Sequence, residues 1–180
     1  MAREVELCGR CTTSLPSFTA AWSGFAYRGQ IERLVQRFKF HRDLAAGRVL
    51  AGLLAVELAR LEAPRPDLMV PVPLHHRRRL VRGFNQAELL CRDLGSHFSG
   101  LPWHSALHRR RATRAQSDLP ADHRRGNVRG AFGFRSLPPG VAHVALVDDV
   151  MTTGSTLDEC ARVLGRAGVR RVDVWVVARA

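Results

Sequence analysis

Apolar residues recur along the N-terminal third of the chain with the periods of both helices and strands. A spacing of three and four residues, typical of an amphipathic helix, begins after Gly29 and runs to Phe38. The same spacing returns from about 44 to 61, just before two prolines, and predicts a second helix. Alternation of small or aromatic residues with polar ones predicts a strand over 21–27.

The middle of the chain mixes strand, loop and helix signals. The apolar run at 68–73 is bounded by prolines, which exclude a helix interior and favour a strand that leads into a loop. We expect that loop over 74–83, a helix over 84–98 and a strand within 101–111. From 111 to 130 the periodicity is lost, which predicts a long loop that is either functional or disordered.

The last third has the clearest pattern. Two buried strands are predicted over 143–150 and 171–178, separated by a turn at 151–156 and a helix over 157–168. A strand, a helix and a second strand in so short a stretch form a βαβ unit. The fold class is therefore α/β, with a mainly parallel sheet flanked by helices.

The composition agrees with one soluble domain. The 180 residues can bury one core, and the apolar fraction of 46% and charged fraction of 24% are ordinary for a globular protein. We predict a domain over 21–180, preceded by a short extension over 1–20. No run reaches the roughly 18 apolar residues of a membrane span. No signal peptide is recognisable, so we expect a cytoplasmic location.

The positive charge is concentrated in one third of the chain. The net charge is +12, and residues 75–135 contribute +9 of it through 13 arginines and four acidic residues. Such a region suits an anionic partner, either a polyphosphate ligand or nucleic acid. The simpler interpretation for most of these arginines is a solvated surface. Only one of the 28 basic residues, Lys39, is a lysine, which indicates a compositional bias toward arginine.

The four cysteines fall into two groups. Cys8 and Cys11 form a CxxC pair that can present two thiolates to Zn²⁺, although a structural zinc site needs four ligands and the second half of a zinc knuckle is missing. Cys91 and Cys160 lie within helical patterns and are predicted to be small core residues.

The candidate chemistry lies at the end of the first strand of the βαβ unit. Ligands bind at the carboxyl ends of parallel strands, where Asp148 and Asp149 are expected. The two carboxylates can accept hydrogen bonds from the vicinal hydroxyls of a ribose. The following turn can offer backbone N–H groups, hydroxyl groups and a helix N-terminus to a phosphate. The turn consists of Thr152, Thr153, Gly154, Ser155 and Thr156.

Other interpretations of this acidic pair are a Mg²⁺ site of a phosphatase-like or receiver-like domain, or a simple helix cap. A phosphatase of the aspartyl-phosphate type has its two acids separated by one residue near the first strand, whereas Asp148 and Asp149 are adjacent and near the last. Neither GxxxxGK[ST] nor GxGxxG occurs. The length of the whole motif favours a ribose 5-phosphate site.

The 13-residue run VALVDDVMTTGST at 144–156 resembles the phosphoribosyl pyrophosphate (PRPP) signature of type I phosphoribosyltransferases. The rest of the chain resembles the competence protein F (ComF) family of that superfamily, through the stretches 25–44, 70–90 and 111–132 and the C-terminal GVRRVDVWVVARA. Members of that family generally begin with two CxxC pairs that form a zinc knuckle. Either the chain begins upstream of Met1 in the full protein, or this member has lost the metal.

The resemblance implies roles for further residues. Asp148 and Asp149 become the catalytic pair, and the turn at 152–156 binds the 5-phosphate of PRPP. Arginine forks are suited to a pyrophosphate that carries Mg²⁺. The pyrophosphate loop would comprise Val72, Pro73, Leu74 and His75, with Arg77 and Arg82 close by. A flexible loop that closes over the site would contain Thr113, Gln116, Arg124 and Asn127.

Two functions follow from the resemblance. One is the transfer of phosphoribosyl from PRPP to the nitrogen of an unidentified acceptor. The other is a non-catalytic PRPP site in an accessory protein that contacts single-stranded DNA or the DNA-uptake machinery. Aromatic residues in the basic region, such as Phe84, Phe98 and Trp103, are too irregularly spaced to form a base-stacking platform.

Overall fold

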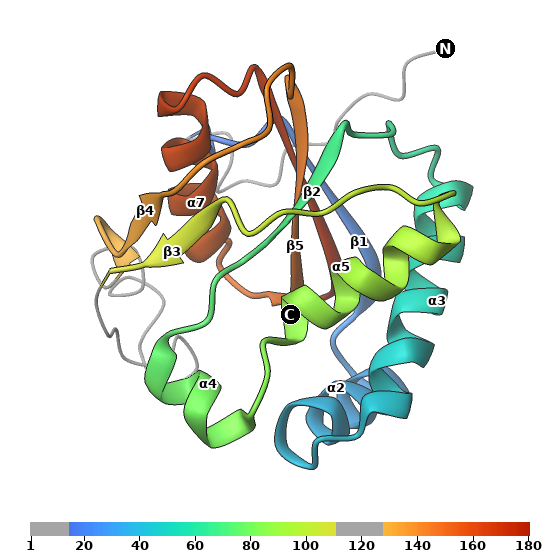
Figure 1. Ribbon diagram of the computed structural model, residues 1–180. Helices are drawn as coiled ribbons and strands as arrows, with labels where there is room; N and C mark the ends of the chain where they lie inside the picture. Colours follow the sequence, from blue (N-terminus) through green and yellow to red (C-terminus); the bar gives the residue numbers. More distant parts are fainter. Residues whose placement is uncertain (1–14, 111–127) are drawn as a thin grey trace.

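A four-stranded parallel sheet forms the centre of the protein (Figure 1). The computed structural model describes residues 15–110 and 128–180. The strand order is β1-β6-β5-β2. The strands are β1 (Ala20–Ala26), β6 (Arg171–Arg179), β5 (His143–Met151) and β2 (Leu68–Pro71). Beside β2, the N–H of Met69 donates to Pro102 and its carbonyl accepts from His104, so residues 102–104 extend that edge of the sheet.

Helices cover both faces of the sheet (Figure 1). One face packs against α2 (Gly29–Phe40), α3 (Leu44–Arg60) and α5 (Gln86–His97). The other face packs against α7 (Ser155–Arg166) and an antiparallel hairpin of β3 (Leu107–Arg109) and β4 (Phe132–Phe134). A short helix, α4 (His76–Arg82), lies between β2 and α5 along the chain. None of the helices within the described ranges combines the length and apolarity needed to cross a bilayer.

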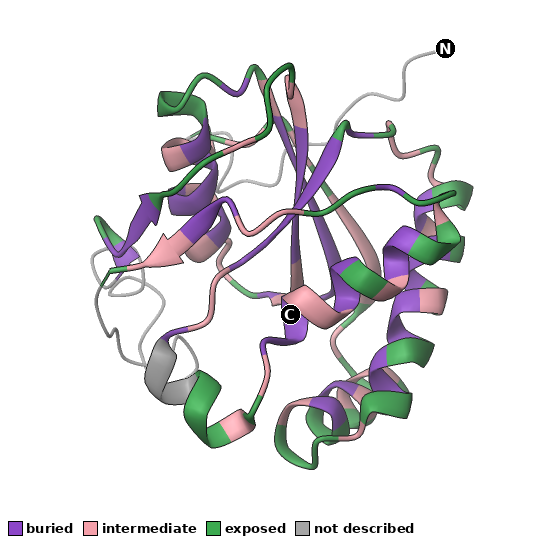
Figure 2. Cartoon of the chain, viewed as in Figure 1, coloured by how far each residue is buried: buried purple, intermediate pink, exposed green. Residues whose placement is uncertain are grey.

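Side chains alternate between the two faces along the central strands, because successive residues of a strand point to opposite sides. In β5, Leu146 belongs to the core on the α7 side and Val147 to the core beneath α3 and α5. Figure 2 shows the resulting largely buried central strands between helices whose outer surfaces are exposed.

Most of the predicted elements are confirmed, including the parallel βαβ unit and the α/β class. Cys91 and Cys160 are buried core residues, and burial raises the pKa of both thiols. The boundary between the extension at 1–20 and the domain at 21–180 stays a prediction.

One local expectation was wrong, one predicted strand is shorter than its stretch, and one strand was missed. The expected loop at 74–83 contains α4, because arginine and leucine are good helix formers and Pro73 precedes the helix while Gly83, at φ 83°, follows it. The strand expected within 101–111 shortens to the three residues of β3. Its partner β4 was not predicted, since three residues are too few for a recognisable period.

Candidate functional site

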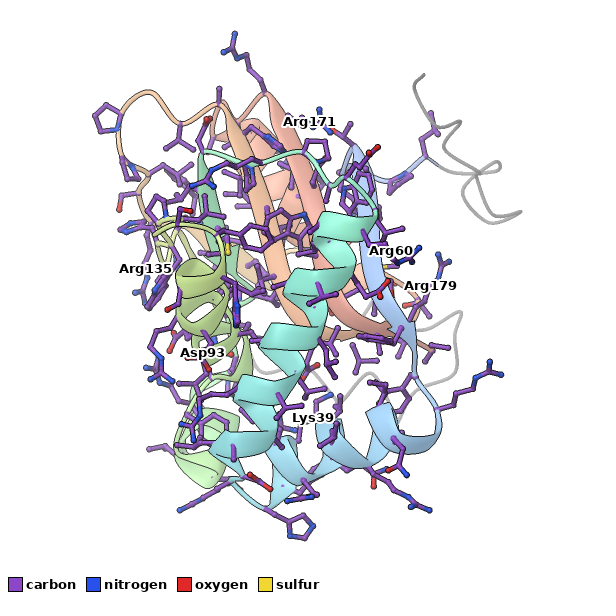
Figure 3. The ribbon with its side chains drawn as sticks, turned by 90° about the vertical axis from the view of Figure 1, so that its right-hand side faces the viewer. Lys39, Arg60, Asp93, Arg135, Arg171 and Arg179 are labelled. Atoms are coloured by element: carbon purple, nitrogen blue, oxygen red, sulfur yellow. The ribbon has the colours of Figure 1, made fainter. Side chains whose placement is uncertain are left out.

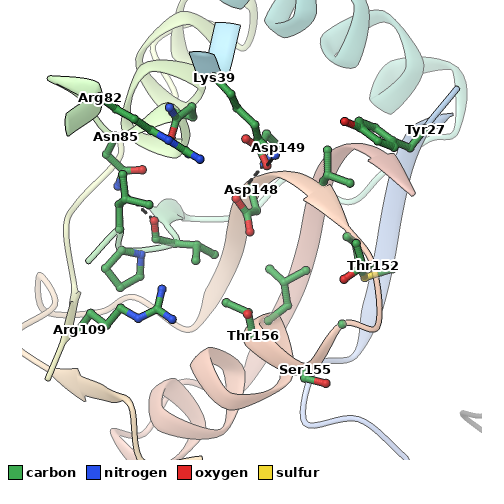
Figure 4. Close-up of a pocket in the computed structure, with 18 of the residues that line it drawn as sticks. Tyr27, Lys39, Arg82, Asn85, Arg109, Asp148, Asp149, Thr152, Ser155 and Thr156 are labelled. Carbon is green, nitrogen blue, oxygen red and sulfur yellow. Dashed lines mark hydrogen bonds and ion pairs between the residues drawn. The ribbon is translucent and has the colours of Figure 1, made fainter. Parts of the chain in front are cut away.

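A cleft of about 790 Å³ opens at the carboxyl ends of β2 and β5 (Figure 4). The C-terminal motif contributes Asp148, Asp149, Thr152, Gly154, Ser155 and Thr156 to its walls. The segment after β2 contributes Val72, Pro73, Leu74 and, from α4, Arg82. Two stretches that are distant in sequence, both predicted to bind parts of one ligand, therefore meet in one cleft.

The turn between β5 and α7 forms one end of the cleft. Gly154 has a φ of 75°, in the left-handed region that glycine tolerates, and it is the N-cap residue of α7. Its carbonyl accepts a hydrogen bond from the N–H of Asp158, and the hydroxyls of Thr153 and Ser155 lie 2.9 Å apart. The turn thus brings the N-terminus of α7 into the cleft wall, where the helix dipole favours an anion.

The acidic pair lies in the middle of the cleft, between the turn and α2. The Nζ atom of Lys39, from the last turn of α2, is 3.0 Å from Oδ1 of Asp149, whose side chain is only 9% exposed. The N–H of Asp149 donates to Oδ1 of Asp148 at 2.9 Å. Figure 4 shows the Lys39 side chain reaching down to this pair. The ammonium of Lys39 therefore pairs with Asp149, directly beside Asp148.

The environment of Asp148 favours its protonated form. Burial, followed by the neighbouring charge of Asp149, raises the pKa of Asp148 to about 7. Lys39 and Arg109 act in the opposite direction and lower that pKa. Asp148 consequently changes its charge near neutral pH, which is unusual for a carboxyl group and typical of functional sites.

Cationic and amide side chains also line the cleft. In Figure 4, Arg82 and Asn85 lie on the side away from the turn, and Arg109 lies beside Thr156. The Nδ2 of buried Asn85 donates to the carbonyl of Val72 at 3.1 Å and thereby holds the end of β2 against α5. Nη1 of Arg82 donates to Oε1 of Gln86 at 3.1 Å. The buried Nε2 of Gln86 has no hydrogen-bond partner within the described part of the chain.

These features give the cleft three chemical zones. The helix N-terminus and the arginines can each hold a phosphate group, while the carboxylates can accept hydrogen bonds from hydroxyl groups. Within 15–110 and 128–180, no group of three or more His, Cys, Asp or Glu side chains is arranged to hold a metal ion.

Some predicted site residues lie elsewhere. His75 is buried and does not line the cleft, and its carbonyl accepts from the N–H of Arg79 inside α4. Thr153 is also absent from the lining and supports Ser155 instead. Arg77 falls in α4, but its side chain is outside what the structure describes. Also outside the described residues are Thr113, Gln116, Arg124 and Asn127, and the cysteines Cys8 and Cys11.

Other cleft residues were missed by sequence reasoning. They are Tyr27, Lys39, Phe40, Arg42, Asn85, Gln86 and Arg109. Lys39 carried the one usable signal, because it is the single lysine among 28 basic residues. The remaining residues stand in ordinary helix or loop contexts, where only the folded chain reveals that they share a cleft.

Relatives with high similarity over most of the chain are known, although no protein-family model matches it. DNA utilization protein YhgH of Salmonella typhi is 41% identical over 177 residues, which cover 96% of this chain and 77% of the relative. Competence protein F of Haemophilus influenzae is 38% identical over 181 residues, covering 96% and 78%. Competence protein ComFC of Streptococcus pneumoniae is 28% identical over 158 residues, covering 86% and 66%.

A solved structure is also similar. Purine phosphoribosyltransferase from Pyrococcus horikoshii has a TM-score of 0.43 and 14% identity, over 74% of this chain and 83% of its own.

Proposed function

The chain belongs to the competence protein F family, and we propose that its cleft binds PRPP as the Mg²⁺ complex. The observation that carries the proposal is the joining of an acidic pair, Asp148 and Asp149, to a helix N-terminus within one cleft that also holds Arg82 and Arg109. PRPP has a 5-phosphate, two ribose hydroxyls and a pyrophosphate. A helix N-terminus, a pair of carboxylates and arginine side chains are the groups that suit these three parts.

Each part of PRPP has a partner in this arrangement. The 5-phosphate accepts hydrogen bonds from the N–H groups and hydroxyls of Ser155 and Thr156. The ribose hydroxyls donate to the acidic pair. The pyrophosphate approaches the backbone of 72–74 and the two arginines, and Mg²⁺ enters as part of this substrate, on the pyrophosphate.

The reaction that such a complex supports is substitution at C1 of the ribose. The bond from C1 to the pyrophosphate oxygen breaks, a bond from the acceptor nitrogen to C1 forms, and the pyrophosphate leaves with both electrons of the broken bond. The arginines stabilise the leaving group, and the carboxylates stabilise the positive charge that develops on the ribose. Asp148, with a pKa of about 7, is suited to accept the proton that the acceptor nitrogen loses.

Calorimetry with PRPP and Mg²⁺ tests the binding site. We expect heat with the native protein, and an affinity at least about 100-fold weaker in Asp148→Asn with Asp149→Asn, because each lost charged acceptor contributes roughly 1.5–3 kcal/mol. A matched control removes two carboxylates outside the cleft, Glu32→Gln with Glu62→Gln, and should bind like the native protein. Absence of heat with the native protein would refute the proposal.

A second candidate function is contact with DNA, in a cytoplasmic accessory role. Two of the relatives are named a DNA utilization protein and a competence protein, and the basic region exposes Arg79, Arg92, Arg110 and Arg135. Pyrophosphate release across a panel of nucleobases and amines would support the transferase. No release, together with single-stranded DNA binding that weakens steeply with salt, would support the accessory role.

A further inference from the structure

Lys39 forms an ion pair with Asp149, one of the two acidic residues of the cleft. Its Nζ lies 3.0 Å from Asp149, and the Lys39 side chain is only 20% exposed, so this is a largely desolvated contact rather than a surface pair. The charge of Lys39 also lowers the pKa of Asp148, the other carboxyl group of the pair. Its side chain occupies the α2 side of the cleft (Figure 4).

The position of Lys39 is fixed by its neighbours on α2. Phe38 is fully buried, stacks on Phe84 with ring centroids 5.5 Å apart, and occupies the space that a side chain at Gly47 would need. Phe40 lies beneath the guanidinium of Arg82, which is 5.4 Å from its ring centroid. With both neighbours held, the helix directs Lys39 to the end of β5.

The residue type at this position is informative. The chain has 28 basic residues, of which 27 are arginines, yet the residue against the acidic pair is a lysine. An ammonium is a compact point charge with three rotatable donors, whereas a guanidinium is planar and bulkier. A compact cation can contact one carboxylate and leave room in the cleft for a ligand.

A pair of adjacent carboxylates at a strand end would ordinarily attract a hard divalent cation, whose preferred ligands are oxygen atoms. Lys39 already places one positive charge beside this pair. We propose that Lys39 is a built-in counter-cation, which excludes a divalent ion from Asp148 and Asp149 and lets them bind the sugar hydroxyls of a phosphorylated ribose directly. The sugar part of this inference rests on the proposed function, while the exclusion of metal does not.

Mn²⁺ binding followed by electron paramagnetic resonance tests the exclusion without any sugar. The native protein and the control Arg33→Met, a change on the exposed side of α2, are expected to hold no Mn²⁺ at the pair. Lys39→Met should gain one bound Mn²⁺, because the carboxylates lose their counter-cation. Adding Asp149→Asn to Lys39→Met should remove that ion.

Calorimetry with ribose 5-phosphate tests the second part, because this probe lacks the pyrophosphate that carries Mg²⁺. The native protein should bind it equally well in EDTA and in Mg²⁺. Lys39→Met should bind at least about tenfold more weakly in EDTA, since the carboxylates then repel the sugar phosphate, and should recover part of the loss in Mg²⁺.

The two experiments separate the two ideas. Mn²⁺ at the acidic pair of the native protein, or Lys39→Met indistinguishable from it in Mn²⁺ binding, would overturn the counter-cation role. Mn²⁺ bound at the pair of the native protein would overturn that role even where the variant does not fold. Failure of ribose 5-phosphate to bind the native protein would count against the proposed function alone, and the Mn²⁺ result would still decide the role of Lys39.

Discussion

The two ends of the parallel sheet both carry buried acidic residues, but the carboxylates differ in how many partners the protein gives them. At the amino end, Asp173 is fully buried, with Nε2 of His143 at 3.0 Å and the guanidinium of Arg171 in contact with both of its oxygens. Nearby, Oδ2 of Asp67 accepts from the N–H groups of Ala142 and His143. Each of these two carboxylates has several donors.

At the carboxyl end, the ammonium of Lys39 pairs with Asp149, and its charge also lowers the pKa of the neighbouring Asp148. Figure 3 places Lys39 and Arg171 at opposite ends of the molecule. At the amino end, the charged groups connect neighbouring strands, and the two carboxylates find their hydrogen-bond donors within the protein. At the carboxyl end, the carboxylate oxygens receive fewer hydrogen bonds from the protein, as expected where a ligand supplies the other donors. Both ends have acidic residues. What distinguishes the structural cluster from the functional one is whether the protein itself supplies hydrogen-bond donors to the carboxylates.

Removing the charge of Asp173 should have the largest effect on stability. Asp173→Asn leaves the guanidinium of Arg171 and the ring of His143 with a neutral partner, so we expect the free energy of unfolding to fall by about 2–3 kcal/mol. Urea unfolding measures this change. PRPP affinity of the folded protein should be unaltered. A variant as stable as the native protein would show that the network contributes nothing to folding.

Removing the charge of Asp148 should act in the opposite direction. Its pKa is about 7 in the folded chain, whereas an aspartate in water has an ordinary pKa of 3.8. Between these values the folded state binds the proton more tightly, so the free energy of unfolding falls as the pH rises through this window. Because Asp148 is only partly shielded from solvent, we expect Asp148→Asn to stabilise the protein by about 1–2 kcal/mol at pH 8 and hardly at all near pH 4.

Thermal unfolding at both pH values, with Glu62→Gln as the surface control, checks this dependence. The same variant should lose PRPP affinity, as is usual where a site gives up stability for function. An equal change at pH 4 and pH 8 would mean that Asp148 is not strained by its surroundings.

The contrast between the two ends was only half visible in the sequence. The βαβ unit and its turn could be predicted because periodicity, Asp148, Asp149 and Gly154 all lie within one short stretch. Asp173 gave no signal, since its burial depends on partners across the sheet, among them His143. Interactions formed within a few residues can be predicted from a pattern, and interactions between distant segments cannot.

The cationic side of the cleft illustrates the same limit. Lys39 reaches Asp149 from the last turn of α2, more than a hundred residues away in the sequence. Arg109 acts on Asp148 from β3, and three-residue strands leave no readable period. Arginine-rich α4 was predicted as a loop because its charge dominated its helix propensity. The acidic half of the site was therefore predicted and most of the cationic half was not.

The smallest expected stability changes come from replacing a glycine in a turn. They allow the turn at the carboxyl end of the sheet to be compared with an ordinary turn. Gly154 and Gly140 both have positive φ, 75° and 82°, and alanine should cost about 1 kcal/mol at either position. A Cβ on Gly154 would lie 3.6 Å from the sulfur of Met151, an ordinary contact, so the cost arises from the backbone.

Relief of that strain rotates the first N–H groups of α7, and Gly154→Ala should therefore weaken PRPP binding at least about tenfold. Gly140→Ala, whose Cβ would meet nothing within 4 Å, should leave the affinity unchanged. Calorimetry on both variants decides the matter, because equal affinities would mean that the turn does not hold the 5-phosphate.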